Sequence, residues 1–284
     1  MNLSHKLVLG TVQFGLNYGI NNRTGQVSQS EVETILKLCD ENGINTLDTS
    51  SAYGNSENVI GKIFAKERYD FHIVSKFPQS EQSVEKALNV SLNQLNQNSL
   101  YGYLIHHFDF YRSHPGIWNE MQVLKEQGKI EKIGFSLYTV SELLYLLENK
   151  VKFDILQFPY NLFDRQFEPY LKELKDRGVE IHTRSVFLQG LFFKNVSSLN
   201  KKLLPLKFYL EKLHHYCHET GISIERLALD YVLCNEYIDG VLIGVDSTNQ
   251  LLENVKASRA VALDFDFVNS LHVREKDLLN PTNW

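Results

Sequence analysis

The feature that most constrains this sequence is an alternation of two kinds of segment, repeated eight times along the chain. The short β-branched and aromatic runs are residues 6–14, 44–50, 71–77, 100–107, 132–138, 154–160, 180–187 and 240–245. Between them lie amphipathic stretches long enough for helices, such as 28–43, 83–96, 116–129, 167–178 and 247–260. Strands that alternate with helices form parallel sheets with right-handed crossovers, and eight such units close a (β/α)8 barrel. We therefore predict an α/β fold, a TIM barrel.

The chain is expected to form one domain. No linker rich in proline, glycine or serine divides its 284 residues, so the prediction is a single domain over residues 1–284. An open, doubly wound sheet is the structural alternative. That fold usually carries a GxGxxG turn after its first strand, whereas the first run here contains GTVQFG.

Composition excludes several classes of function. Lys and Arg total 29 and Asp and Glu total 34, a net charge of −5, so no nucleic-acid or anionic-membrane partner is expected. No apolar run approaches the ~20 residues that a membrane span needs. Three cysteines without a CxxC pair indicate a reducing compartment, so we expect a cytoplasmic protein. No exposed apolar stripe indicates assembly, and a monomer is expected.

Metal binding is not predicted. The segment HHYCH at residues 214–218 offers two histidines and a cysteine at helical spacing, but no fourth ligand is evident. We interpret these side chains as packed or solvated.

Polar residues stand at the carboxyl ends of three successive predicted strands. Asp48 ends the second run, and Tyr53 follows it in the loop. Lys76 ends the third run, and His106 with His107 ends the fourth. In a barrel of this kind, active sites lie at the carboxyl ends of the strands. We therefore expect these side chains to meet.

The four residue types can supply acid catalysis together. A lysine inside an apolar barrel needs a charge partner, which Asp48 on the neighbouring strand can provide. The Lys76 ammonium would stabilise a phenolate and so lower the pKa of Tyr53. Tyr53 would then act as a general acid that protonates a carbonyl oxygen as hydride arrives. A neutral His106 could donate a hydrogen bond to the same oxygen.

At these residues the sequence resembles the aldo/keto reductase superfamily. The matching segments run nearly the length of the chain and keep the family's order. They are LGTVQFG (9–15), LDTSSAYGNSENVIG (47–61), SKF (75–77), LIHH (104–107), ILQFPYNLFD (155–164), SVFLQGLF (185–192) and IGVDSTNQLLENV (243–255). The resemblance implies a (β/α)8 barrel that binds NADP(H) or NAD(H) and reduces a small-molecule carbonyl substrate.

The resemblance also implies a set of functional residues. The catalytic set is Asp48, Tyr53, Lys76 and His106. The predicted cofactor-binding residues are Gly10, Thr11, Ser136, Gln157, Arg184, Ser185, Gln189, Gly190, Gly244, Asp246, Gln250, Glu253 and Asn254. Among these, Ser136 and Gln157 are expected to hold the carboxamide. The predicted substrate-binding residues rest on position: they are Gln13, His107 and Asn161 at the mouth and Trp284 in the C-terminal tail, whose ring could dock on the barrel mouth or simply pack on the surface.

Three positions depart from the family pattern. Leu137 stands where many members have asparagine, and Arg184 stands where many stack an aromatic ring on the nicotinamide. A planar guanidinium can also stack. Asp246 lies in a segment where NADPH-dependent members often carry Lys or Arg. A carboxylate would repel a 2′-phosphate but accept a hydrogen bond from a ribose hydroxyl, so the preference between the two cofactors stays open.

Other functions remain compatible with the sequence. The same fold could hold the cofactor as a redox sensor with little turnover. A different barrel enzyme, a lyase or isomerase, could use Lys76 as a Schiff-base nucleophile. The polar candidate residues at the mouth favour a sugar-like or hydroxylated carbonyl compound as substrate.

Overall fold

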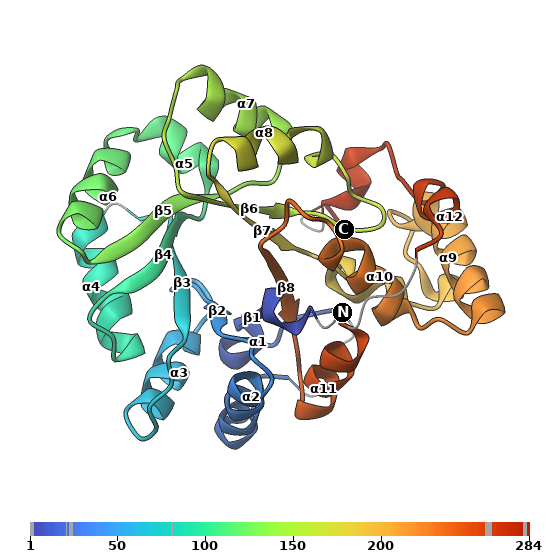
Figure 1. The fold of residues 1–284 in the computed structure, drawn as a ribbon, viewed down its shortest axis with the longest axis horizontal. Helices are drawn as coiled ribbons and strands as arrows, with labels where there is room; N and C mark the ends of the chain where they lie inside the picture. Colours follow the sequence, from blue (N-terminus) through green and yellow to red (C-terminus); the bar gives the residue numbers. More distant parts are fainter. Residues whose placement is uncertain (1–2, 21, 23–24, 81, 259–262, 281–282) are drawn as a thin grey trace.

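Eight parallel strands form a closed barrel in which each strand pairs with its neighbours in sequence and β1 pairs with β8 (Figure 1). The computed structural model describes residues 3–20, 22, 25–80, 82–258, 263–280 and 283–284. The strands are β1 (Leu7–Gly10), β2 (Thr46–Asp48), β3 (His72–Phe77), β4 (Leu100–Ile105), β5 (Ile130–Ser136), β6 (Ile155–Pro159), β7 (Glu180–Arg184) and β8 (Gly240–Gly244). The predicted TIM barrel is therefore confirmed.

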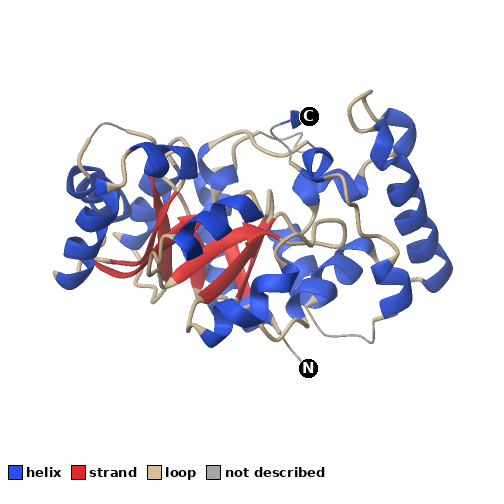
Figure 2. Ribbon diagram, turned by 90° about the horizontal axis from the view of Figure 1, so that it is seen from above, coloured by secondary structure: helices blue, strands red, loops and turns tan. Residues whose placement is uncertain are grey.

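Helices surround the strands (Figure 2). They are α1 (Val12–Gly15), α2 (Gln29–Glu41), α3 (Ser56–Phe64), α4 (Val84–Leu95), α5 (Phe108–Ser113), α6 (Gly116–Glu126), α7 (Val140–Glu148), α8 (Leu171–Asp176), α9 (Lys207–Thr220), α10 (Ile224–Leu233), α11 (Thr248–Ala257) and α12 (Phe265–Asn269). Short 3-10 helices are η1 (Ser4–Lys6), η2 (Glu168–Tyr170), η3 (Leu188–Phe193), η4 (Val196–Ser198), η5 (Leu204–Leu206) and η6 (Lys276–Leu279). Ser28 and Ser83 cap α2 and α4 by accepting from a backbone N–H of the first turn.

The first predicted strand is too long. Residues 6–14 were expected to be extended, but β1 ends at Gly10 and residues 12–15 form the helical turn α1. Gly15 allows α1 to pack closely on the Tyr53 loop, because a Cβ there would lie 1.7 Å from the carbonyl oxygen of Tyr53. The expected helix 247–260 ends at Ala257, and its last two residues lie outside the described residues.

The core fills the space between the strands and the helices. Trp118 of α6 stacks on Phe135 of β5, with ring centroids 4.6 Å apart. Inside the barrel, Val74, Leu104 and Ile155 form a small apolar cluster. Side chains alternate along each strand, so polar residues two positions further along the same strands also point inward. A polar layer therefore lies on the carboxyl side of the apolar cluster.

Candidate active site

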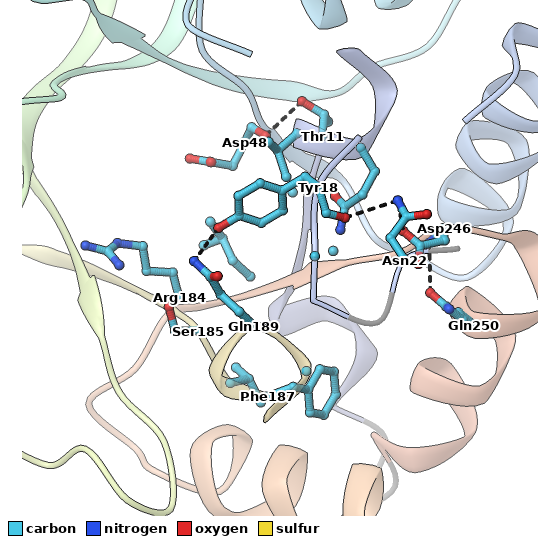
Figure 3. A pocket seen from close by; sticks show the side chains of 18 of the residues that line it. Thr11, Tyr18, Asn22, Asp48, Arg184, Ser185, Phe187, Gln189, Asp246 and Gln250 are labelled. Atoms are coloured by element: carbon cyan, nitrogen blue, oxygen red, sulfur yellow. Dashed lines mark hydrogen bonds between the residues drawn. The ribbon is translucent and has the colours of Figure 1, made fainter. Parts of the chain in front are cut away.

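A pocket of about 780 Å³ opens at the carboxyl ends of the strands. Small-molecule and cofactor sites are typically about 300–1,000 Å³, so the pocket is in the range of a cofactor site. Its wall includes residues from the ends of β1, β2, β5, β6, β7 and β8, together with α11. Figure 3 shows Asp48 and Thr11 on one side of the pocket and Asp246 and Gln250 on another.

Lys76 and Asp48 form a buried ion pair beneath this pocket. Their side chains are 1% and 2% exposed, and Lys76 Nζ donates to Asp48 Oδ1 at 2.5 Å. Nζ also donates to the carbonyl oxygen of Thr49 at 2.8 Å. Burial lowers the pKa of Lys76, but the charge of Asp48 and the interactions of Nζ with Asp48 and Tyr53 more than reverse this, so the net pKa is raised. The ammonium is therefore held charged inside the barrel.

A hydrogen-bonded chain continues from Asp48 across the barrel. Gln157 Nε2 donates to Asp48 Oδ2 at 2.7 Å, and Ser136 Oγ donates to Gln157 Oε1 at 3.3 Å. All three side chains are buried and line the pocket. These hydrogen bonds fix the orientation of the Gln157 amide, because both the nitrogen and the oxygen of the amide have a defined partner. Ser136 and Gln157, predicted to act together, are in contact.

Tyr53 stands on the pocket wall close to the buried ion pair. Lys76 Nζ lies 5.0 Å from the centroid of the Tyr53 ring. Lys76 lowers the pKa of Tyr53 as expected, but this is not the largest effect on it. Burial raises the pKa of Tyr53, and the opposing effect of the Lys76 ammonium only partly offsets it. The phenol is therefore protonated near neutral pH, the form that a proton donor requires.

Glycines set the position of Tyr53. Gly15 and Gly54 allow α1 and the Tyr53 loop to approach closely: a Cβ on Gly54 would lie 2.3 Å from the Gly15 carbonyl oxygen. Gly54 also has a φ of +58°, which L side chains rarely adopt. The loop after β2 thus has one well-defined path, and Tyr53 is fixed by it.

His106 is neutral at the pocket wall. Burial is the main cause that lowers its pKa, with further lowering from the positive charges of Lys76 and Arg184, and the pKa falls to about 2. Its ring meets Tyr53 edge to face, with centroids 6.0 Å apart, and stacks on His107 at 4.7 Å. His106 Nδ1 is 3.2 Å from Ser50 Oγ. The imidazole can therefore donate or accept a hydrogen bond without carrying charge.

The chain leaves β7 through a strained segment. Ser185, Leu188 and Gln189 have φ values of +63°, +47° and +54°, unusual for residues other than glycine. Asn161 holds this segment: its Nδ2 donates to the Ser185 carbonyl oxygen at 3.0 Å. Strain of this kind clusters at functional sites. Here it brings Ser185, Gln189 and Gly190 to the pocket.

Two loops meet across the pocket. Gln189 Nε2 donates to the Tyr18 hydroxyl at 2.6 Å, which joins the loop after β1 to the segment after β7 (Figure 3). Farther from the predicted catalytic set, Asn22 Nδ2 donates to Asp246 Oδ1 at 3.4 Å, and the Asp246 N–H donates to Gln250 Oε1 at 2.8 Å. This far end of the pocket carries amides and carboxylates.

Most predicted site residues come together at the pocket. Those that line it are Gly10, Thr11, Gln13, Asp48, Tyr53, His106, Ser136, Gln157, Arg184, Ser185, Gln189, Gly190, Gly244, Asp246, Gln250, Glu253 and Asn254. The set includes every predicted cofactor-binding residue. Lys76 does not line the pocket, because it is buried beneath Asp48.

Three predicted substrate residues lie elsewhere. His107 is exposed beside His106 and does not line the pocket. Asn161 is fully buried and bonded to backbone groups, including the N–H of Phe163. The indole N–H of Trp284 donates to the Leu278 carbonyl oxygen at 2.9 Å, away from the pocket wall. Of this group only Gln13 reaches the pocket.

Sequence reasoning missed several residues of the wall. They are Val12, Gly19, Asn22, Tyr138, Val186, Phe187, Phe193, Glu225, Leu242 and Asn249. Tyr138 stands two residues beyond Ser136, and the guanidinium of Arg184 lies 4.0 Å from its ring centroid. The position of Tyr138 just after a strand was a usable signal. Phe187 and Phe193 come from the strained segment after β7; the matching segment at 185–192 marked this region, but not which way its aromatic side chains point.

Two features are absent from the described residues. No group of three or more His, Cys, Asp or Glu among them could hold a metal ion. In the part of the chain that the structure describes, no helix is long and apolar enough to cross a membrane. Within the HHYCH segment, His214 Nε2 pairs with the Phe192 carbonyl oxygen at 2.7 Å.

The family is shown by comparison with known proteins. The model of the Aldo/keto reductase family matches residues 6–273, so the chain belongs to this family. The chain is 28% identical to L-galactose dehydrogenase of Arabidopsis thaliana, an alignment that covers 82% of this chain and 79% of that protein. It is 25% identical to the NADH-specific methylglyoxal reductase of Escherichia coli, over 83% of this chain and 84% of that protein.

A solved structure supports the fold. An aldo-keto reductase from Bacillus halodurans in its holo form superimposes with a TM-score of 0.74 and 21% sequence identity. The match covers 95% of this chain and 94% of that one. At this identity the likeness shows the fold alone.

Proposed function

We propose that the protein is an NAD(P)H-dependent reductase that converts an aldehyde or ketone to an alcohol, with Tyr53 as the general acid. The observation that carries this proposal is the arrangement of Tyr53 at the pocket wall, between the buried Lys76–Asp48 pair and the neutral His106. A protonated donor, a charge that stabilises its anion and a neutral hydrogen-bonding group are the requirements for protonating a carbonyl oxygen.

The pocket has features that fit a nicotinamide dinucleotide. Gly10 and Gly244 pair in register at the ends of β1 and β8, so no side chain from either position fills this part of the pocket. A Cβ on Gly244 would lie 2.6 Å from the Gln13 amide. Gln13 Oε1 is buried and has no hydrogen-bond partner among the described residues, so it can accept from a ligand.

The residues that would hold the dinucleotide form three groups, one for each part of the cofactor. Ser136 and Gln157 would bind the carboxamide, and the segment from Ser185 to Gly190 would lie along the pyrophosphate. Gln250, Glu253 and Asn254 would face the adenosine end. The bound nicotinamide supplies a hydride. This assignment rests on the resemblance and on the presence of all these residues on one pocket wall.

The residues of the protein then transfer one proton to the substrate. Tyr53 donates its hydroxyl proton to the carbonyl oxygen as negative charge develops there. The Lys76 ammonium stabilises the phenolate that remains, and Asp48 keeps Lys76 charged and fixed. His106 orients the carbonyl oxygen by hydrogen bonding. Because Lys76 and Asp48 are buried, water is excluded from the surroundings of the lysine ammonium.

The substrate is proposed to be a small, polar carbonyl compound. The pocket wall that carries Tyr53 and His106 also includes Gln13, Tyr138 and Arg184, which can bind hydroxyl or carboxylate groups. The named activities of the relatives, on L-galactose and on methylglyoxal, are of the same chemical kind. We also propose that the protein acts as a cytoplasmic monomer.

The test is a reduction assay with purified protein. NADH or NADPH is mixed with methylglyoxal, glyoxal or a series of aldose sugars, and the loss of nucleotide absorbance is followed. We expect turnover with at least one small polar carbonyl. Tight nucleotide binding with no turnover on any carbonyl would instead support a redox sensor.

The Schiff-base alternative is disfavoured by the position of Lys76. Its Nζ is bonded to Asp48 and Thr49, it is 1% exposed, and it does not line the pocket. A charged amine in this state is not a nucleophile. Borohydride trapping of a substrate adduct on Lys76 would contradict this conclusion.

A further inference from the structure

We propose that Ser50 is a positioning residue that holds His106 as the tautomer with its proton on Nε2. The catalytic consequence rests on the proposed reductase function, whereas the tautomer itself follows from the contacts of these two side chains. Ser50 belongs to the loop after β2, two residues beyond Asp48, and it is 1% exposed. No feature of the sequence pointed to this role.

The direction of the hydrogen bond follows from the contacts of the Ser50 hydroxyl. Its oxygen accepts from the backbone N–H of Ala52 at 3.1 Å. The same oxygen lies 3.2 Å from His106 Nδ1. A hydroxyl has one proton to donate, and Nδ1 is the one acceptor for that proton among the contacts described for Ser50. Ser50 therefore donates to Nδ1.

The opposite direction would leave a buried donor without a partner. If Nδ1 carried the proton and donated to Ser50, the hydroxyl hydrogen would have no acceptor among the described contacts. An unsatisfied buried donor costs about 1–3 kcal/mol, which is enough to determine the tautomer. A doubly protonated ring is excluded by the surroundings, since Lys76 and Arg184 both disfavour a further positive charge.

The consequence for the site is a fixed donor. With Nδ1 occupied as an acceptor, the ring proton of His106 is on Nε2, the nitrogen that remains for a ligand. A carbonyl oxygen placed beside Tyr53 then receives one hydrogen bond from the phenol and one from the imidazole. The wrong tautomer would present a lone pair to that oxygen and repel it.

The decisive experiment is ¹⁵N nuclear magnetic resonance of the histidine rings at neutral pH, with the His106 signals assigned by their loss in His106→Gln. Chemical shifts distinguish a protonated ring nitrogen from an unprotonated one. We expect Nε2 to be protonated and Nδ1 to be unprotonated in the wild-type chain. A proton on Nδ1, or on both nitrogens, would overturn the proposal and leave the reductase function untouched.

Variants extend the test to the catalytic consequence. Ser50→Ala removes the donor, and we expect a mixture of tautomers with a kcat about 2–10-fold lower, the loss of one ordinary hydrogen bond. The KM for the nucleotide should not change. Ser51→Ala is the matched control, because Ser51 Oγ is buried with no hydrogen-bond partner in the described part of the chain. An unchanged tautomer and kcat in Ser50→Ala would overturn the positioning role, as would equal losses in both variants.

Discussion

The two ends of the barrel each carry a lysine, a carboxylate, a tyrosine and a histidine, in different states. The pocket set at the carboxyl end consists of Lys76, Asp48, Tyr53 and His106. The base set at the amino end consists of Lys132, Glu180, Tyr101 and His182. In both, the lysine Nζ lies near the tyrosine ring, at 5.0 Å and 4.6 Å from its centroid. In both, the lysine is ion-paired with the carboxylate.

The base set is closed on itself. The Tyr101 hydroxyl accepts from Lys132 at 2.7 Å and donates to Glu180 at 2.7 Å. His182 Nε2 pairs with the other Glu180 oxygen at 2.7 Å. The adjoining pocket is about 400 Å³, half the volume of the pocket at the carboxyl end. The tyrosine hydroxyl here is occupied by the ion pair rather than turned to a ligand.

The pocket set differs in its carboxylate: Lys76 interacts with both Asp48 and Tyr53, but the second oxygen of Asp48 accepts from Gln157, whereas Glu180 accepts from its tyrosine. The partners of Asp48 are Lys76 and Gln157, and Tyr53 remains on the wall of a large pocket. The same four residue types therefore give a stabilising network at one end and a site for proton transfer at the other. The hydrogen-bond partners of the carboxylate and the size of the adjoining cavity, rather than residue type, separate the two.

Removal of the buried lysine should have the largest effect. Lys76→Met leaves Asp48 as an unpaired buried charge, and we expect a loss of about 3–5 kcal/mol in the free energy of unfolding. We also expect kcat to fall about 10²–10⁴-fold, because the phenolate loses its stabilising charge. Chemical denaturation and steady-state kinetics measure the two effects. Wild-type kcat in a folded variant would show that Lys76 has no catalytic role.

The corresponding change in the base set should separate stability from activity. Lys132 and Glu180 are 29% and 17% exposed, so solvent screens their ion pair more than it screens the Lys76–Asp48 pair. We expect Lys132→Met to lower the free energy of unfolding by roughly 1–3 kcal/mol and to leave kcat unchanged. A fall in kcat comparable to that of Lys76→Met would abolish the distinction between the two ends.

Cofactor preference tests the part of the carboxyl-end pocket that contains Asp246. Asp246 lines it and would repel the 2′-phosphate of NADPH, so we expect NADH to bind at least about tenfold more tightly. Fluorescence titration with each nucleotide gives the ratio, and added salt should reduce it. Asp246→Arg should reverse the preference. Asp70→Arg, at the exposed loop before β3, makes the same charge change at the other end and should not alter the ratio.

The pH dependence of stability tests the base set with a smaller effect. Burial alone would raise the pKa of Glu180, but hydrogen bonds and charge from His182 and Lys132 lower it to about 2. The unfolded value is about 4.3, so this carboxylate stabilises the fold above that pH and loses the contribution as pH falls toward 2. Glu180→Gln should therefore reduce the loss of stability between pH 6 and pH 3. An identical loss in the two proteins would contradict the assignment.

Sequence reasoning located the pocket set because strand ends are marked by residue type. Asp48 is the one carboxylate of β2 and Lys76 the one lysine of β3, and the barrel places both at one end. The predictions failed where the function of a residue depends on the direction or the burial of its side chain. Asn161 follows a strand and was expected in the pocket, yet its amide is turned to the Ser185 backbone. The raised pKa of Tyr53 likewise depends on burial, which no spacing reveals.

The measurement that tests the central claim most directly compares Tyr53→Phe with Tyr101→Phe in single-turnover reduction. Each variant removes one hydroxyl from one end of the barrel. We predict that Tyr53→Phe binds the nucleotide as the wild type does but loses hydride transfer by about 10²–10⁴-fold. Tyr101→Phe should keep the wild-type rate and be less stable. Wild-type hydride transfer in Tyr53→Phe would contradict the account.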